Sequence, residues 1–181
     1  MWRLVDGIAS QLAPQPQQGA PAIFLDRDGT LIHDPGYLRD PSLVRLLPGV
    51  PEGLGRLASS GYALVLVSNQ SGVGRGLITA EELEAVHRRM GALLEAEGLP
   101  LSGAWYCTHP PEQRCACRKP APGLLLAAAA ALALPLGRSW MIGDRPSDVA
   151  AGQAAGVQTV LLDAETPDLI AASRLILDVR P

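Results

Sequence analysis

Two carboxylates stand two residues apart in the run Asp26-Arg27-Asp28-Gly29-Thr30, directly after a short apolar segment. The glycine permits a tight turn, after which Asp26 and Asp28 can face one ligand while Arg27 points away from it. Hard cations such as Mg²⁺ prefer oxygen ligands of this kind. Nearby Asp residues are also common turn formers. The loop by itself therefore leaves two interpretations open, a metal-binding site and a plain turn.

Three further short motifs could act on a phosphate group. Ser68 and the backbone N–H groups after it could form a phosphate cradle, although Ser-Asn and Ser-Gly pairs also occur in ordinary turns. Arg118-Lys119 could neutralise charge on a transferred phosphoryl group, or form a solvated surface patch. Asp144 adds a third carboxylate, which could instead cap a helix. Each motif is weak alone, and their value depends on whether the fold brings them together.

A compact group of soft ligands lies between residues 107 and 117. Cys107, His109, Cys115 and Cys117 use every cysteine of the chain, and Pro110 and Pro111 lie between them. Three thiolates and one imidazole suit a closed, tetrahedral zinc site of the structural kind. The alternative is a set of incidental or redox-active cysteines. The spacing favours a zinc-binding loop that also fixes the Arg118-Lys119 pair directly behind it.

The elements that must position these residues follow from alternating short apolar runs and amphipathic segments. Strand and helix alternate along the chain, which predicts a Rossmann-like parallel sheet with helices on both faces. Ligands of such a sheet bind beyond the carboxyl ends of the strands, and Asp26, Ser68 and Asp144 all follow predicted strands. The predicted strands are 22–25, 63–67, 104–106, 140–142 and 159–162, and the predicted helices are 50–59, 79–97, 122–134 and 147–155.

Length and composition predict one domain over residues 21–181, preceded by a loose tail over residues 1–20 that is rich in Pro and Gln. The net charge of −3 gives no sign of nucleic-acid binding. The longest apolar stretch, 124–136, is shorter than the roughly 20 residues that cross a bilayer. We therefore expect a cytoplasmic monomer without nucleic-acid or membrane partners. The family resemblance described next implies that it acts on a small phosphorylated substrate.

Taken in this order and at these strand ends, the four motifs resemble the signature of the haloacid dehalogenase (HAD) superfamily from residue 22 to residue 163. The resemblance implies a magnesium-dependent phosphatase with Asp26 as nucleophile and Asp28 as general acid and base. It implies that Ser68 and Lys119 bind the phosphoryl oxygens. It also implies that the Asp26 side chain, the Asp28 backbone carbonyl and Asp144 hold Mg²⁺. The short connections leave no room for a large cap domain, so an open site is expected.

The cysteine–histidine group narrows the resemblance to the zinc-containing branch of the superfamily. That branch contains phosphatases of heptose 1,7-bisphosphate and of histidinol phosphate. The loop through Tyr37 favours the heptose enzymes, whereas the five residues between His109 and Cys115 are similar to the histidinol-phosphate enzymes. A third possibility is a zinc-binding interaction module with a degenerate active site. The resemblance implies these substrate-binding residues: Asp34, Gly36, Tyr37, Asn69, Gln70, Ser71, Arg118 and Arg145.

Overall fold

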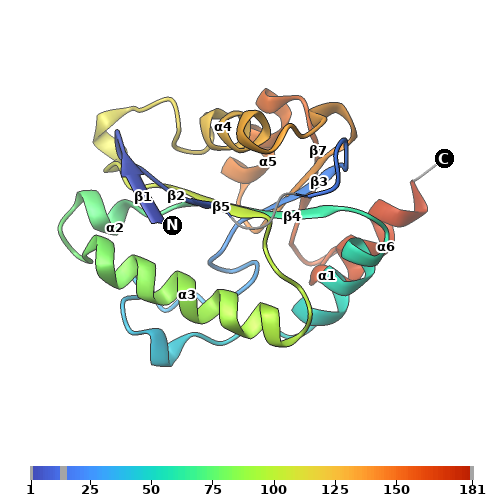
Figure 1. Ribbon diagram of the computed structural model, residues 1–181, viewed down its shortest axis with the longest axis horizontal. Coiled ribbons are helices and arrows are strands. Elements are labelled where there is room, and N and C mark those ends of the chain that lie inside the picture. The colour runs from blue at the N-terminus through green and yellow to red at the C-terminus, as the bar shows by residue number, and fades with distance from the viewer. Residues whose placement is uncertain (1, 13–15, 180–181) are drawn as a thin grey trace.

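The computed structural model describes residues 2–12 and 16–179 and forms a three-layer α/β fold (Figure 1). Its sheet has seven strands in the order β1-β2-β5-β4-β3-β6-β7. The five strands from β5 to β7 in this order run parallel to one another. Strands and helices have these bounds: β1 Trp2–Val5, β2 Ile8–Leu12, β3 Ala22–Leu25, α1 Val50–Ser59, β4 Ala63–Asn69, α2 Ser71–Gly74, α3 Ala80–Ala96, β5 Gly103–Cys107, α4 Gly123–Leu132, β6 Trp140–Gly143, α5 Pro146–Ala155, β7 Gln158–Leu161 and α6 Leu169–Asp178.

Helices cover both faces of the sheet, as predicted. Helices α4 and α5 lie on one face, while α1, α3 and α6 lie on the other (Figure 1). Side chains of a strand alternate between the faces, so each central strand supplies two separate cores. In β3, Phe24 packs into the core under α4 and α5, whereas Ile23 and Leu25 pack into the larger core under the other helices. Burial on both faces explains why these strands appear in the sequence as continuous apolar runs.

The expected helices and parallel strands are confirmed, with small shifts of their ends. Helix α3 begins with a capping box, in which the Thr79 side chain accepts from the Glu82 N–H and the Glu82 carboxylate accepts from the Thr79 N–H. Helix α6 was not predicted. The connection from β3 to α1, residues 26–49, is described throughout and contains one short 3₁₀ helix, Pro41–Leu43. No cap domain is inserted there, and the active-site edge of the sheet stays open.

The N-terminal segment differs from the expected tail. Strands β1 and β2 form a hairpin, and β2 pairs antiparallel with β5, so the sheet is mixed rather than wholly parallel. Asp6 and Gly7 form its two-residue turn with φ of 46° and 70°, which is the chemistry of a tight hairpin turn. That Asp-Gly pair was the missed signal. Of the expected tail, residues 1 and 13–15 lie outside the described part of the chain.

For His87, within the predicted helix 79–97, the sequence favours a surface or edge position, and this prediction is wrong. His87 lies in α3 with 6% of its surface exposed, and its Nδ1 is 2.8 Å from the hydroxyl oxygen of Tyr106 in β5. Burial and the positive charge of Arg27 lower the pKa of His87 to about 4. The imidazole is therefore neutral and belongs to the interior. No helix among the described residues is long and apolar enough to cross a membrane.

Candidate active site and metal centres

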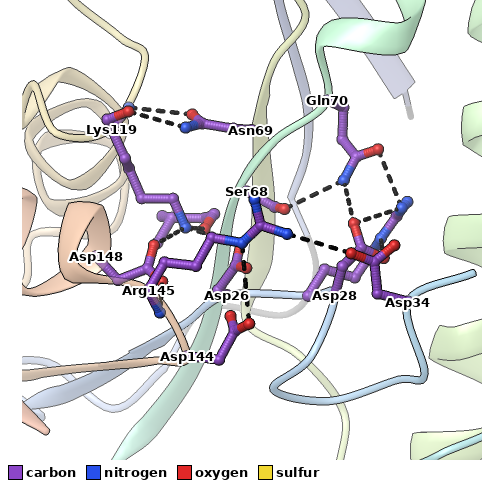
Figure 2. A network of polar contacts seen from close by, with 12 residues as sticks. Asp26, Asp28, Asp34, Ser68, Asn69, Gln70, Lys119, Asp144, Arg145 and Asp148 are labelled. Carbon is purple, nitrogen blue, oxygen red and sulfur yellow. Dashed lines mark hydrogen bonds and ion pairs between the residues drawn. The ribbon is translucent and has the colours of Figure 1, made fainter. Parts of the chain in front are cut away.

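Three predicted site residues meet at one edge of the sheet because their strands are neighbours. Strand β3 lies between β4 and β6, with Leu25 opposite both Leu66 and Ile142. Asp26 follows β3, and its N–H donates to the carbonyl of Ile142 (3.0 Å). Ser68 lies near the end of β4, and Asp144 follows β6. Figure 2 shows the side chains of Asp26, Ser68 and Asp144 in one group at this edge.

Lys119 joins this group from the loop that precedes α4. Its Nζ lies 2.7 Å from an oxygen of Asp26 and 2.7 Å from an oxygen of Asp148, and it donates to the carbonyl of Val67 (2.8 Å). Burial lowers the pKa of Lys119, but the negative charges of Asp26 and Asp148 outweigh it and raise the pKa. Lys119 is therefore a fixed cation beside the Asp26 carboxylate, and Asp148 is a direct partner that orients it.

A set of carboxylates can hold a divalent cation here. Oxygens of Asp26, Asp144 and Asp148 lie within 4.8 Å of one another. One oxygen of Asp144 is buried without a hydrogen-bond partner, and burial followed by the charge of Asp26 raises the pKa of Asp144. A Cβ on Gly29 would lie 2.4 Å from Asp144, so only glycine fits beside this carboxylate. Clustered, underused oxygen ligands suit Mg²⁺.

Asp28 lies on the other side of the group, with 17% of its side chain exposed. The pKa of Asp28 is raised, mainly because the carboxyl is buried. The positive charge of Arg27 opposes this rise, and the negative charge of Asp26 adds to it. Arg27 does not line the cleft, in keeping with its expected direction away from the ligand. Its guanidinium nevertheless pairs with Asp28 (2.8 Å), a contact that the sequence did not indicate.

The expected substrate-binding residues line a single cleft of about 500 Å³ that contains Asp26, Asp28 and Lys119. At its rim, Arg145 pairs with Asp34 (3.3 Å), as Figure 2 shows. Asn69 lies deeper and brackets the backbone of Lys119, donating to its carbonyl and accepting from its N–H (both 3.0 Å). All eight of these residues belong to the lining: Asp34, Gly36, Tyr37, Asn69, Gln70, Ser71, Arg118 and Arg145.

Arg75 and Ser147 also line the cleft and were not among the expected site residues. Arg75 donates to the Tyr37 hydroxyl (2.9 Å) and pairs with Glu112 (3.0 Å). Arg75 lies in the Gly-rich run from Asn69 to Gly76. A single charged side chain among these small residues was the available signal. Ser147 has no comparable sequence signal.

The four soft ligands converge as predicted at the end of β5. Sulfur and Nδ1 atoms of Cys107, His109, Cys115 and Cys117 lie 3.1–3.5 Å from their neighbours. A tetrahedral zinc site with Zn–S distances of about 2.3 Å has ligand separations of about 3.8 Å, so the geometry can hold such an ion. The N-terminal hairpin supports the loop, since the Gly7 carbonyl accepts from the N–H (2.8 Å) and hydroxyl (2.7 Å) of Thr108.

Known proteins resemble this chain in both sequence and fold. The profile of the HAD-hydrolase-like family matches residues 116–171. A D-glycero-beta-D-manno-heptose-1,7-bisphosphate 7-phosphatase of Photorhabdus laumondii is 41% identical over 152 residues, covering 80% of this chain and 81% of the relative.

Two solved structures share the fold over most of the chain. A HAD-like phosphatase of Mesorhizobium loti has a TM-score of 0.81 and 30% identity, and the match covers 95% of each chain. The D,D-heptose 1,7-bisphosphate phosphatase of B. bronchiseptica, complexed with magnesium and phosphate, has a TM-score of 0.80 and 29% identity, covering 88% of this chain and 99% of that one. The chain, a phosphoric monoester hydrolase by its relatives and its fold, therefore belongs to the HAD-like phosphatases, in the family of the D-glycero-beta-D-manno-heptose-1,7-bisphosphate 7-phosphatases.

Proposed function

We propose that this protein removes the 7-phosphate of D-glycero-D-manno-heptose 1,7-bisphosphate through an aspartyl-phosphate on Asp26. The observation that carries the chemistry is the contact of 2.7 Å between Asp26 and the buried cation of Lys119, with Asp28 beside them in the same cleft. The substrate follows from the name of the relative that is 41% identical across most of both chains.

In the first half-reaction, a carboxylate oxygen of Asp26 attacks phosphorus, and the bond from phosphorus to the sugar oxygen breaks. Asp28 donates its proton to the leaving sugar oxygen, a role that suits its raised pKa, caused first by burial and opposed by Arg27. The Lys119 ammonium and the Ser68 hydroxyl stabilise the charge on the phosphoryl oxygens. Asp148 and the Val67 carbonyl keep the Lys119 ammonium in place.

In the second half-reaction, Asp28 accepts a proton from water as that water attacks the phosphorus of the aspartyl-phosphate. The acyl–phosphate linkage breaks, inorganic phosphate leaves, and the Asp26 carboxylate is restored. Asp28 thus returns to the protonated state in which it began, so no other proton donor is required.

Two metals belong to the proposal. The Asp26 side chain, the Asp28 backbone carbonyl and Asp144 would hold Mg²⁺, which would offset repulsion between the nucleophile and the phosphate. Cys107, His109, Cys115 and Cys117 would hold a structural zinc ion that fixes the loop bearing Arg118 and Lys119. The use of all three cysteines as ligands suits the reducing cytoplasm.

The open cleft supports a substrate with a second phosphate. Arg118 and Arg145 line the cleft that contains the nucleophile, and Arg118 has a buried nitrogen, Nη1, without a hydrogen-bond partner. A guanidinium of this kind binds phosphate oxygens through paired hydrogen bonds. We infer that these residues contact the 1-phosphate, while the rim residues Asp34 and Tyr37 contact the sugar.

The deciding experiment compares kcat/KM for heptose 1,7-bisphosphate and histidinol phosphate in the presence of Mg²⁺. Histidinol phosphate is the second candidate because the spacer of five residues between His109 and Cys115 resembles that of its phosphatases. We expect a clear preference for the bisphosphate, and a preference for histidinol phosphate would overturn the assignment. The matched Asp26→Asn variant should lose at least about 10⁴-fold in kcat, and turnover near the wild-type rate would refute the nucleophile. A wild-type protein that does not hydrolyse p-nitrophenyl phosphate with Mg²⁺ would favour the zinc-binding module instead.

A further inference from the structure

A buried positive charge lies beside the acid–base residue of the proposed reaction. Arg27 is 1% exposed and does not line the cleft, so it cannot contact the substrate. Burial of a guanidinium is costly unless its charge is paired and its hydrogen bonds are satisfied. The contacts of Arg27 therefore indicate why a charge is kept at this position.

Arg27 binds Asp28 with two parallel hydrogen bonds from one side of its guanidinium. Its Nε donates to one oxygen of Asp28, Oδ1 (2.9 Å), and its Nη2 donates to the other, Oδ2 (2.8 Å). The same Nη2 also donates to Oε1 of Gln70 (3.0 Å), whose Nε2 donates to Oδ2 of Asp28 (2.7 Å). Figure 2 shows Gln70, the residue after β4, reaching toward Asp28 and Ser68. The three side chains form a closed ring of hydrogen bonds in which Asp28 has one orientation.

The backbone of Arg27 is fixed as well. Its carbonyl accepts from the N–H groups of Leu31 (2.9 Å) and Ile32 (3.0 Å). Tyr106 lies near enough that the charge of Arg27 opposes the rise that burial causes in the pKa of the tyrosine. The guanidinium thus has little freedom to leave Asp28.

The two oxygens of Asp28 are not equivalent in this ring. Oδ2 accepts two hydrogen bonds, from Arg27 and Gln70, whereas Oδ1 accepts one, from Arg27. A carboxylate oxygen has two lone pairs, so Oδ1 keeps one lone pair for a proton. That oxygen can give its proton to the leaving group and later receive one from water without breaking the ring.

We propose that Arg27 is a positioning residue for the phosphatase reaction, which acts by holding Asp28 so that its Oδ1 exchanges the catalytic proton. Gln70 is its partner on the other oxygen. The inference rests on the proposed function, because it assigns the orientation of the general acid and base. A lysine would keep the charge but not the bidentate contact.

Leaving-group dependence tests the proposal, because protonation helps a sugar alkoxide to leave far more than it helps p-nitrophenolate. A general acid contributes about 10²–10⁴-fold. We expect Arg27→Lys to lower kcat/KM for heptose 1,7-bisphosphate by about 10–100-fold and for p-nitrophenyl phosphate by less than about threefold. The matched control is Arg56→Lys, at an exposed ion pair with Glu52 on α1, which should change neither value.

Equal losses on the two substrates would reduce Arg27 to a structural role and overturn the proposal, as would the absence of any loss. In an Asp28→Asn background, adding Arg27→Lys should not lower kcat/KM for the sugar substrate any further. An additive loss would also overturn the proposal. If Arg27→Lys does not fold, Gln70→Leu should show the same leaving-group pattern. A wild-type enzyme inactive on the bisphosphate would refute the substrate instead, and any alkyl phosphate that it accepts would still test Arg27.

Discussion

The two ends of the cleft are built differently. At the deep end, Lys119 is 2% exposed and pairs with two carboxylates that are 9% and 2% exposed. At the rim, Arg145 is 62% exposed and pairs with Asp34 at 3.3 Å, where the carboxylate is 35% exposed. We assign the deep end to the chemistry at phosphorus and the rim to the rest of the substrate.

This difference indicates a division of labour. Buried ion pairs are little screened by solvent, and removing one partner leaves an unpaired charge, so the deep end is rigid and intolerant of change. Exposed pairs contribute little to stability, so the rim can exchange its internal contacts for contacts with a substrate. The predictions below test whether the two ends separate in this way.

The largest effect is expected at Lys119. In Lys119→Met, the carboxylates of Asp26 and Asp148 lose their shared cation, and we expect a loss of about 3–5 kcal/mol in the free energy of unfolding. The kcat should fall by about 10²–10³-fold because the phosphoryl charge loses its stabilising cation. Urea unfolding and steady-state kinetics measure the two effects.

The double variant Lys119→Met/Asp148→Asn serves as the control for this prediction. It removes one of the two unpaired carboxylates, so it should recover part of the stability but none of the activity. A single variant as stable as the wild type would contradict the buried, interdependent character of the deep end.

The loop of the proposed zinc ligands, residues 107–117, directly precedes Arg118 and Lys119. Both of these residues line the cleft, with Lys119 at its deep end. We expect about one zinc ion per chain in the wild type and almost none in Cys115→Ala, measured by elemental analysis. The Tm should fall by roughly 8 °C. This corresponds to a loss of about 2–4 kcal/mol in the free energy of unfolding, since about 1 kcal/mol shifts the Tm of a chain of this length by about 2–4 °C.

Gln113→Ala, in the same loop but without a ligand, is the matched control for Cys115→Ala and should keep both zinc and Tm. If Cys115→Ala kept its Tm and its activity after losing zinc, the structural role of the metal would be wrong.

The rigid interior should extend to His87, which is buried in α3 against Tyr106 of β5. Its pKa of about 4 is below the unfolded value of about 6.5, so between these values the unfolded chain binds the proton and the folded chain does not. Burial of His87 therefore does not lower the free energy of unfolding above about pH 6.5. As the pH falls from 6.5 toward 4, protonation of the unfolded chain lowers this free energy by about 3 kcal/mol in total.

Replacement of this histidine isolates its contribution from that of the carboxylates. His87→Gln should flatten the pH dependence of stability between pH 6.5 and 4, measured by urea unfolding. His33→Gln, at an exposed histidine, should leave it unchanged. An equal slope in wild type and His87→Gln would show that burial of this imidazole does not control acid stability.

The smallest effect is expected at the rim. Arg145→Ala should raise KM for the bisphosphate about three- to tenfold with kcat unchanged, because it removes binding that the ground state and transition state share. The free energy of unfolding should stay within about 0.5 kcal/mol of the wild type. Arg174→Ala, on the exposed surface of α6, should change neither quantity. A large loss of kcat in Arg145→Ala would remove the distinction between the two ends.

Local patterns in the sequence were sufficient to predict the parallel strands, the edge where the site lies and the metal-binding loop. The apolar runs before Asp26, Ser68 and Asp144 predict parallel strands, and parallel strands present their carboxyl ends at one edge. The spacing of the cysteines and His109 predicts a single metal-binding loop, and these ligand atoms do converge. These inferences succeed because each depends on residues that are close in the chain or on a rule that fixes how strand ends meet.

Only the tertiary structure decided the contacts that depend on long-range packing. Nothing local indicates that the Arg27 guanidinium turns onto Asp28 and Gln70, or that His87 is buried against Tyr106. A side chain chooses among its rotamers according to the charges and space around it, and these come from distant parts of the chain. The strand ends therefore determined where the chemistry occurs, and side-chain packing across the sheet determined how its charges are oriented.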